Sequence, residues 1–599
     1  MGILRALAIF AVILLATLLV VAPSAGARGI SRPLLKDVAL SGVALEQAYA
    51  NPLLPFSYPY VGGLDRRPGV ASNGYWSWQD VMAPIPSAQP LAVSVFVNAP
   101  SNNVSDPSFP PIDNVVSLQL PSGSFSRIVL RLDVALESAV PGRPGANYDR
   151  PLWIFVDGVP LLIGTTAQRF NWTVSYDVTY LYPLLVGGTH TFVLRVPNWV
   201  IPRLGLVGYF VVNATLLYYP GQPPPDAPDA IVPLWTWVAL SRSTPYAIAN
   251  ATVPSNAVRA LLYVFTEGAS YDEFWWADIP TDRLLIVSAG QKVIAVTQPF
   301  PYIYTGGIMP FMWRPVPAIG TYAFDPLVVD VTPYLPFMVG STTFNITITN
   351  NANYWLVGGF LALKLSQSPV SYAFIGDSPS LSRTESTTPT PTGAVYRVSV
   401  KYDNRASLNI TVSGTTYTYT VAYSLSFVSV QAYNDVWWNS TVQESWAYTA
   451  SAPGFGESRH SSASTVMLYR EVVVPQGDIS KATVSNPVPA SDVLSVVLQQ
   501  SYHTRVHRSA QGIASTLETN QQLYSNGYMN VGLLFVSPTG AVITSINAVF
   551  ARTVKTAYVS YRVGPSELFR FTRYTAGGTN YPPLAYLLIR DVVGTYSAM

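Results

Sequence analysis

The chain has 599 residues, a net charge of +2 at pH 7 and only 11% charged residues. A chain of this length has room for several domains of ordinary size. Its near-neutral charge lacks the basic surface that binds phosphate backbones, so we expect no nucleic-acid partner. Cysteine is absent, which excludes disulfides, thiolate metal ligands and cysteine nucleophiles.

The N-terminal segment predicts export from the cytosol. Arg5 is followed by an apolar run over 6–22, and Ala25-Gly26-Ala27 forms a small-residue cleavage site. We therefore predict a signal peptide over 1–27 and a secreted, extracellular or cell-surface protein. If the segment is retained, it would instead anchor the chain to a membrane, because its apolar run approaches the length that spans a bilayer.

The rest of the chain predicts an all-β fold. Short runs such as 127–134 are rich in apolar and β-branched residues, and 50 prolines and 40 glycines separate such runs, as is typical of sandwiches and barrels. The phrase Asp-Val-Thr-Tyr-Leu over 177–181 returns as Asp-Val-Thr-Pro-Tyr-Leu over 330–335, one of several phrases that repeat in the same order. This repetition predicts two tandem copies of one β-sandwich unit.

The composition also divides the chain into segments. We predict an irregular lead over 28–85, a first unit over 86–222, a second unit over 229–366, a linker over 367–393, and a β-rich C-terminal region of unknown role over 394–599. The best candidate for a helix lies in that last region, over 491–500, and it is short.

The most informative segment is Tyr-Asp-Glu-Phe-Trp-Trp, over 271–276. It places two carboxylates beside three consecutive aromatic rings, which suits a site that stacks a sugar ring and performs acid–base chemistry next to it. Downstream stand Pro-Phe-Pro-Tyr-Ile-Tyr-Thr-Gly-Gly over 299–307, Trp-Arg-Pro over 313–315, and Trp-Leu-Val-Gly-Gly over 355–359.

These motifs, in this order, resemble segments of the plant-type peptide-N-glycanases, the peptide-N4-(N-acetyl-β-glucosaminyl)asparagine amidase A family. Members of that family carry N-D-E-F-W, then P-F-P-x-I-Y-T-G-G-I…W-R-P, then W-L-V-x-G. The resemblance implies a hydrolase that cuts the amide between asparagine and N-acetylglucosamine in N-glycosylated peptides or proteins. The implied products are an Asp-peptide and a free glycosylamine, and no cofactor is implied.

The bacterial peptide-N-glycanases are distantly similar, and their resemblance implies two jelly-roll units and a catalytic pair. Their essential aspartate lies in a W-D-R-Y-A-N-V-Y-V segment that 148–156 resembles, which marks Asp149 as the general base. Their second carboxylate lies in an A-E-W-C-F-R segment that 272–275 resembles, which marks Glu273 as a group assisting substrate binding or the leaving group. If the two units pack side by side, their equivalent rims would bring these two residues together.

A third carboxylate of the bacterial enzymes, in a T-E-T-W segment, has no acidic counterpart in this chain. Pro197 or Asn198 stands opposite it, before Trp199, and Asn198 is the polar candidate. The full set of substrate-binding candidates is Asp272, Trp275, Trp276, Trp313, Arg314, Arg150 and Asn198.

Each candidate also has a structural alternative. Asp149 beside Arg150 could form a surface ion pair in a turn, and Arg314 could bond a loop carbonyl. The tryptophans could belong to the core, where large aromatic side chains usually lie. Asp272 could be the working acid in place of Glu273, because neighbours on a strand point to opposite faces.

Other chemistries find less support. His503 and His507 lie four residues apart and could share a strand face, but a zinc site needs further ligands, so we predict no metal. Two other functions stay open: a non-catalytic carbohydrate-binding or cell-envelope structural protein on the same scaffold, and a glycosidase that uses two carboxylates on a sugar–sugar bond. Product chemistry separates them, because only an amidase changes Asn to Asp.

Overall fold

The computed structural model describes residues 76–77, 88–103, 111–141, 149–167, 171–200, 207–224, 226–304, 308, 317–434, 436–510, 513–537, 540–563, 566–581 and 588–593. The predicted signal peptide and almost all of the predicted lead lie outside these ranges. The described chain is built almost wholly of antiparallel strands, so the predicted all-β class is confirmed.

The first unit is a sandwich of two sheets, with strand orders β1-β7-β4-β9-β2 and β3-β8-β5-β6. Only β1 pairs in parallel, with β7. Its strands are β1 (Trp76–Ser77), β2 (Leu91–Pro100), β3 (Asp113–Gln119), β4 (Phe125–Ser138), β5 (Pro151–Val156), β6 (Val159–Thr165), β7 (Trp172–Asp177), β8 (Thr189–Arg195) and β9 (Gly208–Pro220).

The second unit is a sandwich with strand orders β10-β17-β12-β15 and β11-β16-β13-β14. Counted from its first strand, this order repeats that of β2 to β9, and both follow the connectivity of an eight-stranded jelly roll. Its strands are β10 (Ala230–Ser241), β11 (Tyr246–Val253), β12 (Ala257–Ala269), β13 (Leu285–Ala289), β14 (Lys292–Thr297), β15 (Leu327–Asp330), β16 (Gly340–Ile348) and β17 (Tyr354–Leu365).

The repeat extends to a helical turn that follows the same strand in each unit. In the first unit β7 leads into η1 (Thr179–Leu181) and α3 (Tyr182–Leu185); in the second, β15 leads into η5 (Thr332–Tyr334) and α4 (Leu335–Met338). Asp177 Oδ1 accepts a hydrogen bond from the amide of Thr179 at 3.0 Å, and Asp330 Oδ1 accepts one from Thr332 at 3.0 Å. The repeated Asp-Val-Thr phrase is therefore one capping turn used twice.

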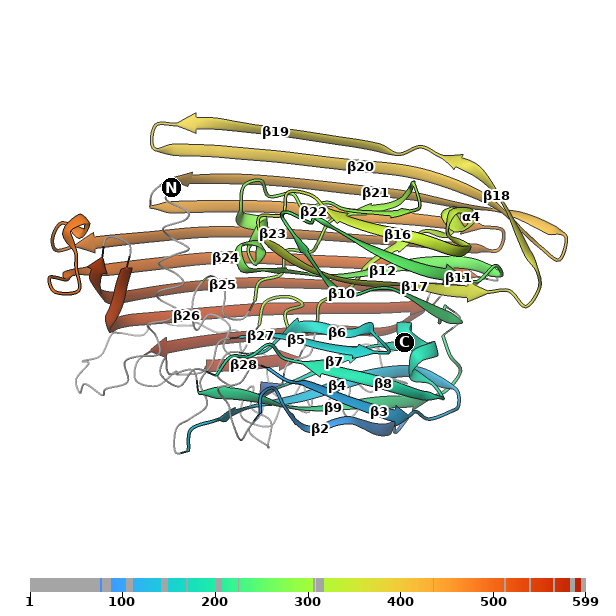
Figure 1. Ribbon diagram of the computed structural model, residues 1–599, viewed down its shortest axis with the longest axis horizontal. Coiled ribbons are helices and arrows are strands. Elements are labelled where there is room, and N and C mark those ends of the chain that lie inside the picture. Colours follow the sequence, from blue (N-terminus) through green and yellow to red (C-terminus); the bar gives the residue numbers. More distant parts are fainter. Residues whose placement is uncertain are drawn as a thin grey trace.

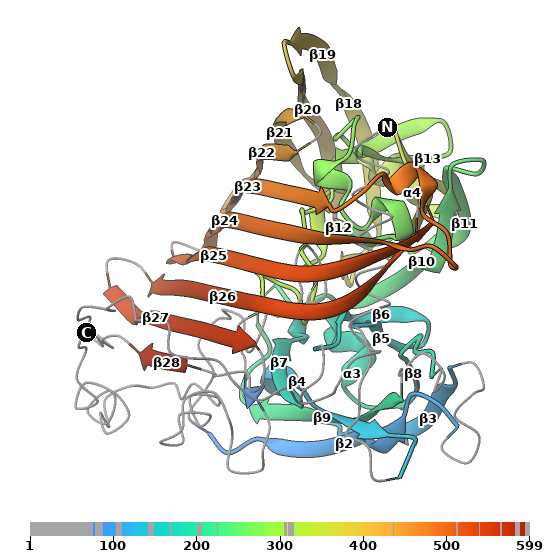
Figure 2. The ribbon, with the colours of Figure 1, turned by 90° about the vertical axis from the view of Figure 1, so that its left-hand side faces the viewer.

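The C-terminal region forms one antiparallel sheet of 11 strands. In Figure 1 this sheet extends behind both units, and in Figure 2 it lies to their left; its strands are much longer than theirs. Its strands are β18 (Val370–Asp377), β19 (Ser380–Thr390), β20 (Gly393–Val412), β21 (Thr415–Asn434), β22 (Trp437–Ala452), β23 (Phe455–Pro475), β24 (Val488–Ala510), β25 (Ile513–Ser537), β26 (Gly540–Val563), β27 (Ser566–Tyr581) and β28 (Leu588–Val593).

Two details differ from the sequence-based prediction. The segment 367–393, predicted as a linker, contains β18 and β19. The residues of β19 are all exposed, and Pro389 is tolerated in it because an edge strand pairs on one side only. The segment 491–500, predicted as a short helix, lies in β24, and every second residue in it is buried, which is the period of a strand.

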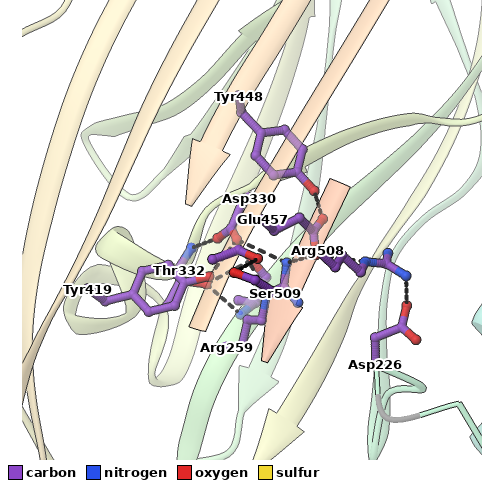
Figure 3. A network of polar contacts seen from close by, with 11 residues as sticks. Asp226, Arg259, Asp330, Thr332, Tyr419, Tyr448, Glu457, Arg508 and Ser509 are labelled. Carbon is purple, nitrogen blue, oxygen red and sulfur yellow. Dashed lines mark hydrogen bonds and ion pairs between the residues drawn. The ribbon is translucent and has the colours of Figure 1, made fainter. Parts of the chain in front are cut away.

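One face of the long sheet packs against the second unit through buried polar contacts as well as apolar ones. Figure 3 shows one of these networks, in which Arg259 of β12 contacts Asp330 at 3.4 Å and Glu457 of β23 at 3.0 Å. Arg508 of β24 bonds Glu457 at 3.0 Å and Asp226, between the two units, at 2.6 Å. The network thus connects three parts of the chain at one point.

The two units also contact each other directly. The backbone amide of Thr165, at the end of β6, donates to the carbonyl of Thr321 at 3.0 Å, and the amide of Phe324 donates to the carbonyl of Ile163 at 2.7 Å. A Cβ at Gly164 would lie 2.3 Å from the Tyr322 carbonyl oxygen, so this close approach requires glycine. Within the described ranges, none of the short helices has the length or apolar character to cross a lipid bilayer.

Candidate active site

The corner that follows β12 holds the two acidic residues singled out from the sequence. The chain leaves β12, turns through η3 (Ser270–Asp272) and then through η4 (Trp275–Ala277), with Glu273 between them. A Cβ at Gly268 would lie 2.3 Å from the Asp272 carbonyl oxygen, so only glycine lets the chain fold back this closely. Ser270 adopts a φ of 59°, which is uncommon for a residue with a side chain.

Asp272 anchors this corner to the start of β17. Its side chain is fully buried, and its Oδ1 accepts from Arg283 Nε at 3.1 Å and from the amide of Ala352 at 3.0 Å. Its Oδ2 accepts from the amides of Asn353 at 2.6 Å and Tyr354 at 3.0 Å. Four donors of its own chain therefore occupy the carboxylate, and this arrangement does not support the substrate contact predicted for Asp272.

Glu273, the next residue, is half-buried and lies in a different electrostatic environment. Burial, the charge of Asp149 and the charge of Glu267 together raise the pKa of Glu273 to about 8. Asp149 is also half-buried and lies two residues before the start of β5 in the first unit. The structure therefore brings the acid predicted from each unit close enough for their charges to interact.

Glu267 is a carboxylic acid that the sequence analysis missed. It lies in β12, is 1% exposed, and its Oε2 accepts a hydrogen bond of 2.7 Å from the indole Nε1–H of Trp153 in β5. Burial raises the pKa of Glu267 to about 8, although the hydrogen bond from Trp153 opposes this. One sequence signal was available: an acidic residue stands in a strand end that is otherwise apolar or small, and acids are rarely buried without a role.

Tyr304 is a second residue that was not predicted from the sequence, although it lies within the 299–307 motif. Its ring is buried, and its hydroxyl donates to the Gly268 carbonyl at 2.7 Å. Burial and the charges of Glu267, Glu273 and Asp149 hold the pKa of Tyr304 well above its usual value. Glu267, Glu273 and Asp149 therefore all lie near the Tyr304 hydroxyl.

Arg150 and Asn198 contact each other within the first unit, where they extend the polar surroundings of Asp149. Arg150 Nε donates to Asn198 Oδ1 at 3.3 Å, and the amide group of buried Asn198 donates to Asn102 Oδ1 at 2.8 Å and to the Gly208 carbonyl at 3.0 Å. Asn198 therefore orients the Arg150 guanidinium. The neighbouring Trp199 is 51% exposed.

The tryptophans of the 271–276 motif lie in the core. Trp275 and Trp276 are 3% and 0% exposed, and Trp276 Nε1 donates to the Tyr302 carbonyl at 3.2 Å. The ring of Trp275 lies 6.2 Å from that of Phe427 in the long sheet. Sugar stacking on these two rings, predicted from the sequence, does not fit their burial, because a stacking platform needs an accessible face. Trp313 and Arg314 lie outside the described residues.

The histidine pair is engaged in contacts within the long sheet. His503 Nε2 lies 3.0 Å from Glu518 Oε1, and His507 Nδ1 lies 2.9 Å from Thr516 Oγ1. Across the part of the chain that the structure describes, no three His, Asp or Glu side chains cluster as metal ligands would. The carboxyl groups and the phenol of the candidate site can carry out proton transfer.

Comparison with known proteins supports the predicted resemblance. Residues 108–370, which include most of the first unit and all of the second, match the family model described as peptide N-acetyl-β-D-glucosaminyl asparaginase amidase A. A Prunus dulcis protein named peptide-N4-(N-acetyl-β-glucosaminyl)asparagine amidase A is 27% identical over 292 residues, covering 41% of this chain and 49% of the relative. The chain thus spans about half the length of that relative.

Solved structures match less closely. A crystal structure of peptide-N(4)-(N-acetyl-β-D-glucosaminyl)asparagine amidase is 13% identical with a TM-score of 0.34, covering 46% of this chain and 98% of its own. PNGase F from Flavobacterium meningosepticum, named a glycosylasparaginase, is 14% identical with a TM-score of 0.32, covering 46% of this chain and 96% of its own. The family match over 108–370 confirms the resemblance to the plant-type peptide-N-glycanases that the sequence motifs predicted.

Proposed function

We propose that this chain is a secreted amidase that hydrolyses the bond between asparagine and N-acetylglucosamine in N-glycosylated peptides or proteins. The observation that carries the proposal is the electrostatic coupling of Asp149, from the first unit, with Glu273, from the second. The match of 108–370 to an amidase family supplies the reaction class. Action outside the cell or at its surface is part of the proposal and rests on the N-terminal sequence.

The proposed reaction begins with a water molecule aimed at the side-chain carbonyl carbon of the glycosylated asparagine. Asp149 accepts one proton from this water as a new carbon–oxygen bond forms, giving a tetrahedral intermediate. Arg150, which Asn198 orients, is the cationic group nearest in sequence to Asp149 and is placed to stabilise the developing oxyanion.

Glu273 then supplies the proton that the leaving group needs. The carbon–nitrogen bond breaks as Glu273 protonates the departing glycosylamine, and the peptide keeps a carboxylic acid in place of the amide. The proton held by Asp149 returns to Glu273 and completes the cycle. Glu273 can act in this way near neutral pH because its pKa is raised to about 8, so the group is protonated when a substrate arrives.

Mass spectrometry of a defined N-glycopeptide tests this proposal with the full chain and two isosteric variants. The wild type should release the glycan and convert Asn to Asp. Asp149→Asn and Glu273→Gln should each lower the rate by about 10²–10⁴-fold, the usual contribution of a general base or acid. Asp403→Asn, at an exposed ion pair on the long sheet, is a matched control that should retain full activity.

Two outcomes would contradict the proposal. Release of the glycan with N-acetylglucosamine left on the asparagine would identify a glycosidase. An unchanged glycopeptide, with the protein folded and tested from acid to neutral pH, would favour a carbohydrate-binding or structural role.

A further inference from the structure

A hollow on the long sheet plays no part in the reaction proposed above. It has a volume of about 420 Å³ and is lined mainly by residues of β22, β23 and β24. Small-molecule sites in proteins usually enclose about 300–1,000 Å³, so this hollow has room for a ligand of one or two rings. Which ligand it fits depends on the side chains that point into it.

Hydrogen bonds identify the face of β22 that packs against the second unit. Trp438 Nε1 donates to Gln431 Oε1 at 2.9 Å, and Gln431 Nε2 donates to Ser440 Oγ at 2.8 Å. Gln431 Nε2 also donates to the Trp276 carbonyl of the second unit at 3.2 Å. Trp438 and Ser440 therefore face the second unit. Because successive residues of a strand point to opposite faces, the residues that alternate with these two point outward.

The outward residues of this part of β22 are Trp437, Asn439 and Thr441, and all three are half-buried. Asn439-Ser440-Thr441 is an Asn-x-Thr sequon, the sequence at which exported chains receive N-linked glycans. Trp437 and Asn439 both line the hollow. An acceptor amide and an indole ring thus share one face of the strand, with their Cα atoms about 7 Å apart.

The chain has six other sequons, at Asn103, Asn171, Asn213, Asn250, Asn345 and Asn409. Four of these have a side-chain oxygen that accepts a hydrogen bond in the folded chain: Asn171, Asn213, Asn250 and Asn409. The side-chain oxygen of Asn345 is buried, and the sequon of Asn103 extends outside the described ranges. Within those ranges neither restriction applies to Asn439, so the fold leaves room for a glycan there.

The neighbouring strands provide surfaces that suit a sugar ring. Leu468 of β23 lies directly opposite Asn439 and is 46% exposed, and Arg470 lies opposite Trp437. Ser495 of β24 is the next residue across from Arg470. A sugar has apolar C–H groups on its faces, which pack on an indole or a leucine, and hydroxyl groups on its rim, which bond a guanidinium or a serine. Both kinds of surface line the hollow.

We propose that Asn439 is an N-glycosylation site and that the first sugar of its glycan lies in the hollow, against Trp437. In this modification Asn439 Nδ2 bonds to the anomeric carbon of a lipid-linked oligosaccharide, and the bond from that carbon to the lipid diphosphate breaks. The proton lost by Nδ2 passes to a base of the transferase. The inference rests on export of the chain, which is part of the proposed function. The glycan leaves from the outward face of the sheet, away from the candidate site of its own chain.

Glycopeptide mass spectrometry of the full chain, purified from a secreting host that N-glycosylates its exported proteins, tests the modification. The Asp149→Asn background prevents the proposed activity from removing the glycan. The peptide that contains Asn439 should carry a glycan in Thr441→Ser, which keeps the sequon, and none in Thr441→Val, which removes it. A bare Asn439 in an exported chain whose other sequons carry glycans overturns the inference. A chain that stays inside the cell, bare at every sequon, contradicts both the inference and the export in the proposed function.

Thermal melting tests whether the sugar packs on the indole. Each variant is made in hosts with and without N-glycosylation, and the rise in unfolding temperature on glycosylation is measured. This rise should be about 2 °C larger for Thr441→Ser than for Thr441→Val. Adding Trp437→Ala to both variants should abolish the difference, because the sugar then has no ring to pack against. A difference that survives Trp437→Ala overturns the proposed packing. A glycan at Asn439 in a chain whose wild type hydrolyses no glycopeptide upholds this inference and contradicts the amidase proposal.

Discussion

Asp272→Asn and Glu273→Gln are isosteric substitutions of neighbouring residues, and the structure predicts opposite effects on stability. Asp272 neutralises Arg283, whose side chain is 1% exposed, at 3.1 Å, and accepts three backbone amides. An asparagine leaves the buried guanidinium without its counter-charge, and losing one partner of a buried ion pair costs about 3–5 kcal/mol. We expect the unfolding temperature of Asp272→Asn to fall by about 10 °C.

Glu273 is the opposite case, because the folded protein already holds it as a neutral acid. Its pKa is raised to about 8 in the folded state, above the value of 4.5 for a free carboxyl. The folded state therefore binds the proton more tightly than the unfolded state. The stabilisation from this proton is complete below about pH 4.5 and is lost as pH rises through about 8. Gln cannot ionise, so Glu273→Gln should match the wild type at pH 5 and exceed it at pH 9, by up to about 4 kcal/mol.

Scanning calorimetry at pH 5, 7 and 9, with glycopeptide hydrolysis measured on the same samples, tests both expectations. Glu273→Gln should hydrolyse the glycopeptide about 10²–10⁴-fold more slowly than the wild type, but only Asp272→Asn should be destabilised at every pH. Equal destabilisation of the two variants would show that Glu273 has a structural role like that of Asp272. An Asp272→Asn protein as stable as the wild type would refute the assignment of Asp272 as the anchor of this corner.

Three further predictions concern stability and the contact between the parts of the chain. Burial would raise the pKa of Glu457, but Arg508 and Arg259 lower it to about 2. The ionised Glu457 therefore stabilises the folded protein above about pH 4.5, and this stabilisation is lost as pH falls through 2. In urea unfolding, Glu457→Gln should therefore lower the free energy of unfolding by about 3 kcal/mol at pH 7 and leave it unchanged at pH 2. A decrease that does not vary with pH would contradict this. Gly164→Val should separate the two units, because its Cβ would lie 2.3 Å from a carbonyl oxygen; loss of activity with retained β-sheet circular dichroism is expected, and full activity would refute it. Burial raises the pKa of Glu444 well above its usual value, so the wild type should become less stable as the pH rises and this acid ionises. Glu444→Gln should remove that part of the loss in thermal melts; melting curves identical to the wild type at every pH would exclude this.

The sequence alone predicted the architecture of the two units well. The repeated Asp-Val-Thr phrase marked the duplication because it encodes a capping turn that both units need, with Asp177 and Asp330 each accepting from the threonine two residues on. The period of the hydrophobic pattern was less reliable in the long sheet. The segment 491–500 alternates in burial, but polar residues such as Asp492 and Gln500 lie on its buried face and disguise the alternation.

The candidate site was predicted in part. Asp149 and Glu273 were predicted as catalytic through the resemblance, and this role stays a prediction; the structure places them near enough for the charge of Asp149 to raise the pKa of Glu273. For Trp275 and Trp276 the structure agrees with the core alternative. The motif alone could not decide between core and stacking, because the sheet that covers these rings comes from a region more than a hundred residues away, with Gln431 bonding the Trp276 carbonyl at 3.2 Å. Glu267 was missed for a similar reason: its importance depends on Trp153 of the other unit, and local sequence does not report that contact.

Hydrolysis of a defined N-glycopeptide in heavy-oxygen water, followed by mass spectrometry of both products, distinguishes attack at the asparagine carbonyl from attack at the sugar. The wild type should place heavy oxygen in the new aspartate side chain, because water attacks the asparagine carbonyl, and Asp149→Asn should not. Release of the whole glycan with an unlabelled peptide that keeps its asparagine would mean attack at the anomeric carbon. That result would contradict the amidase mechanism and the roles given to Asp149 and Glu273.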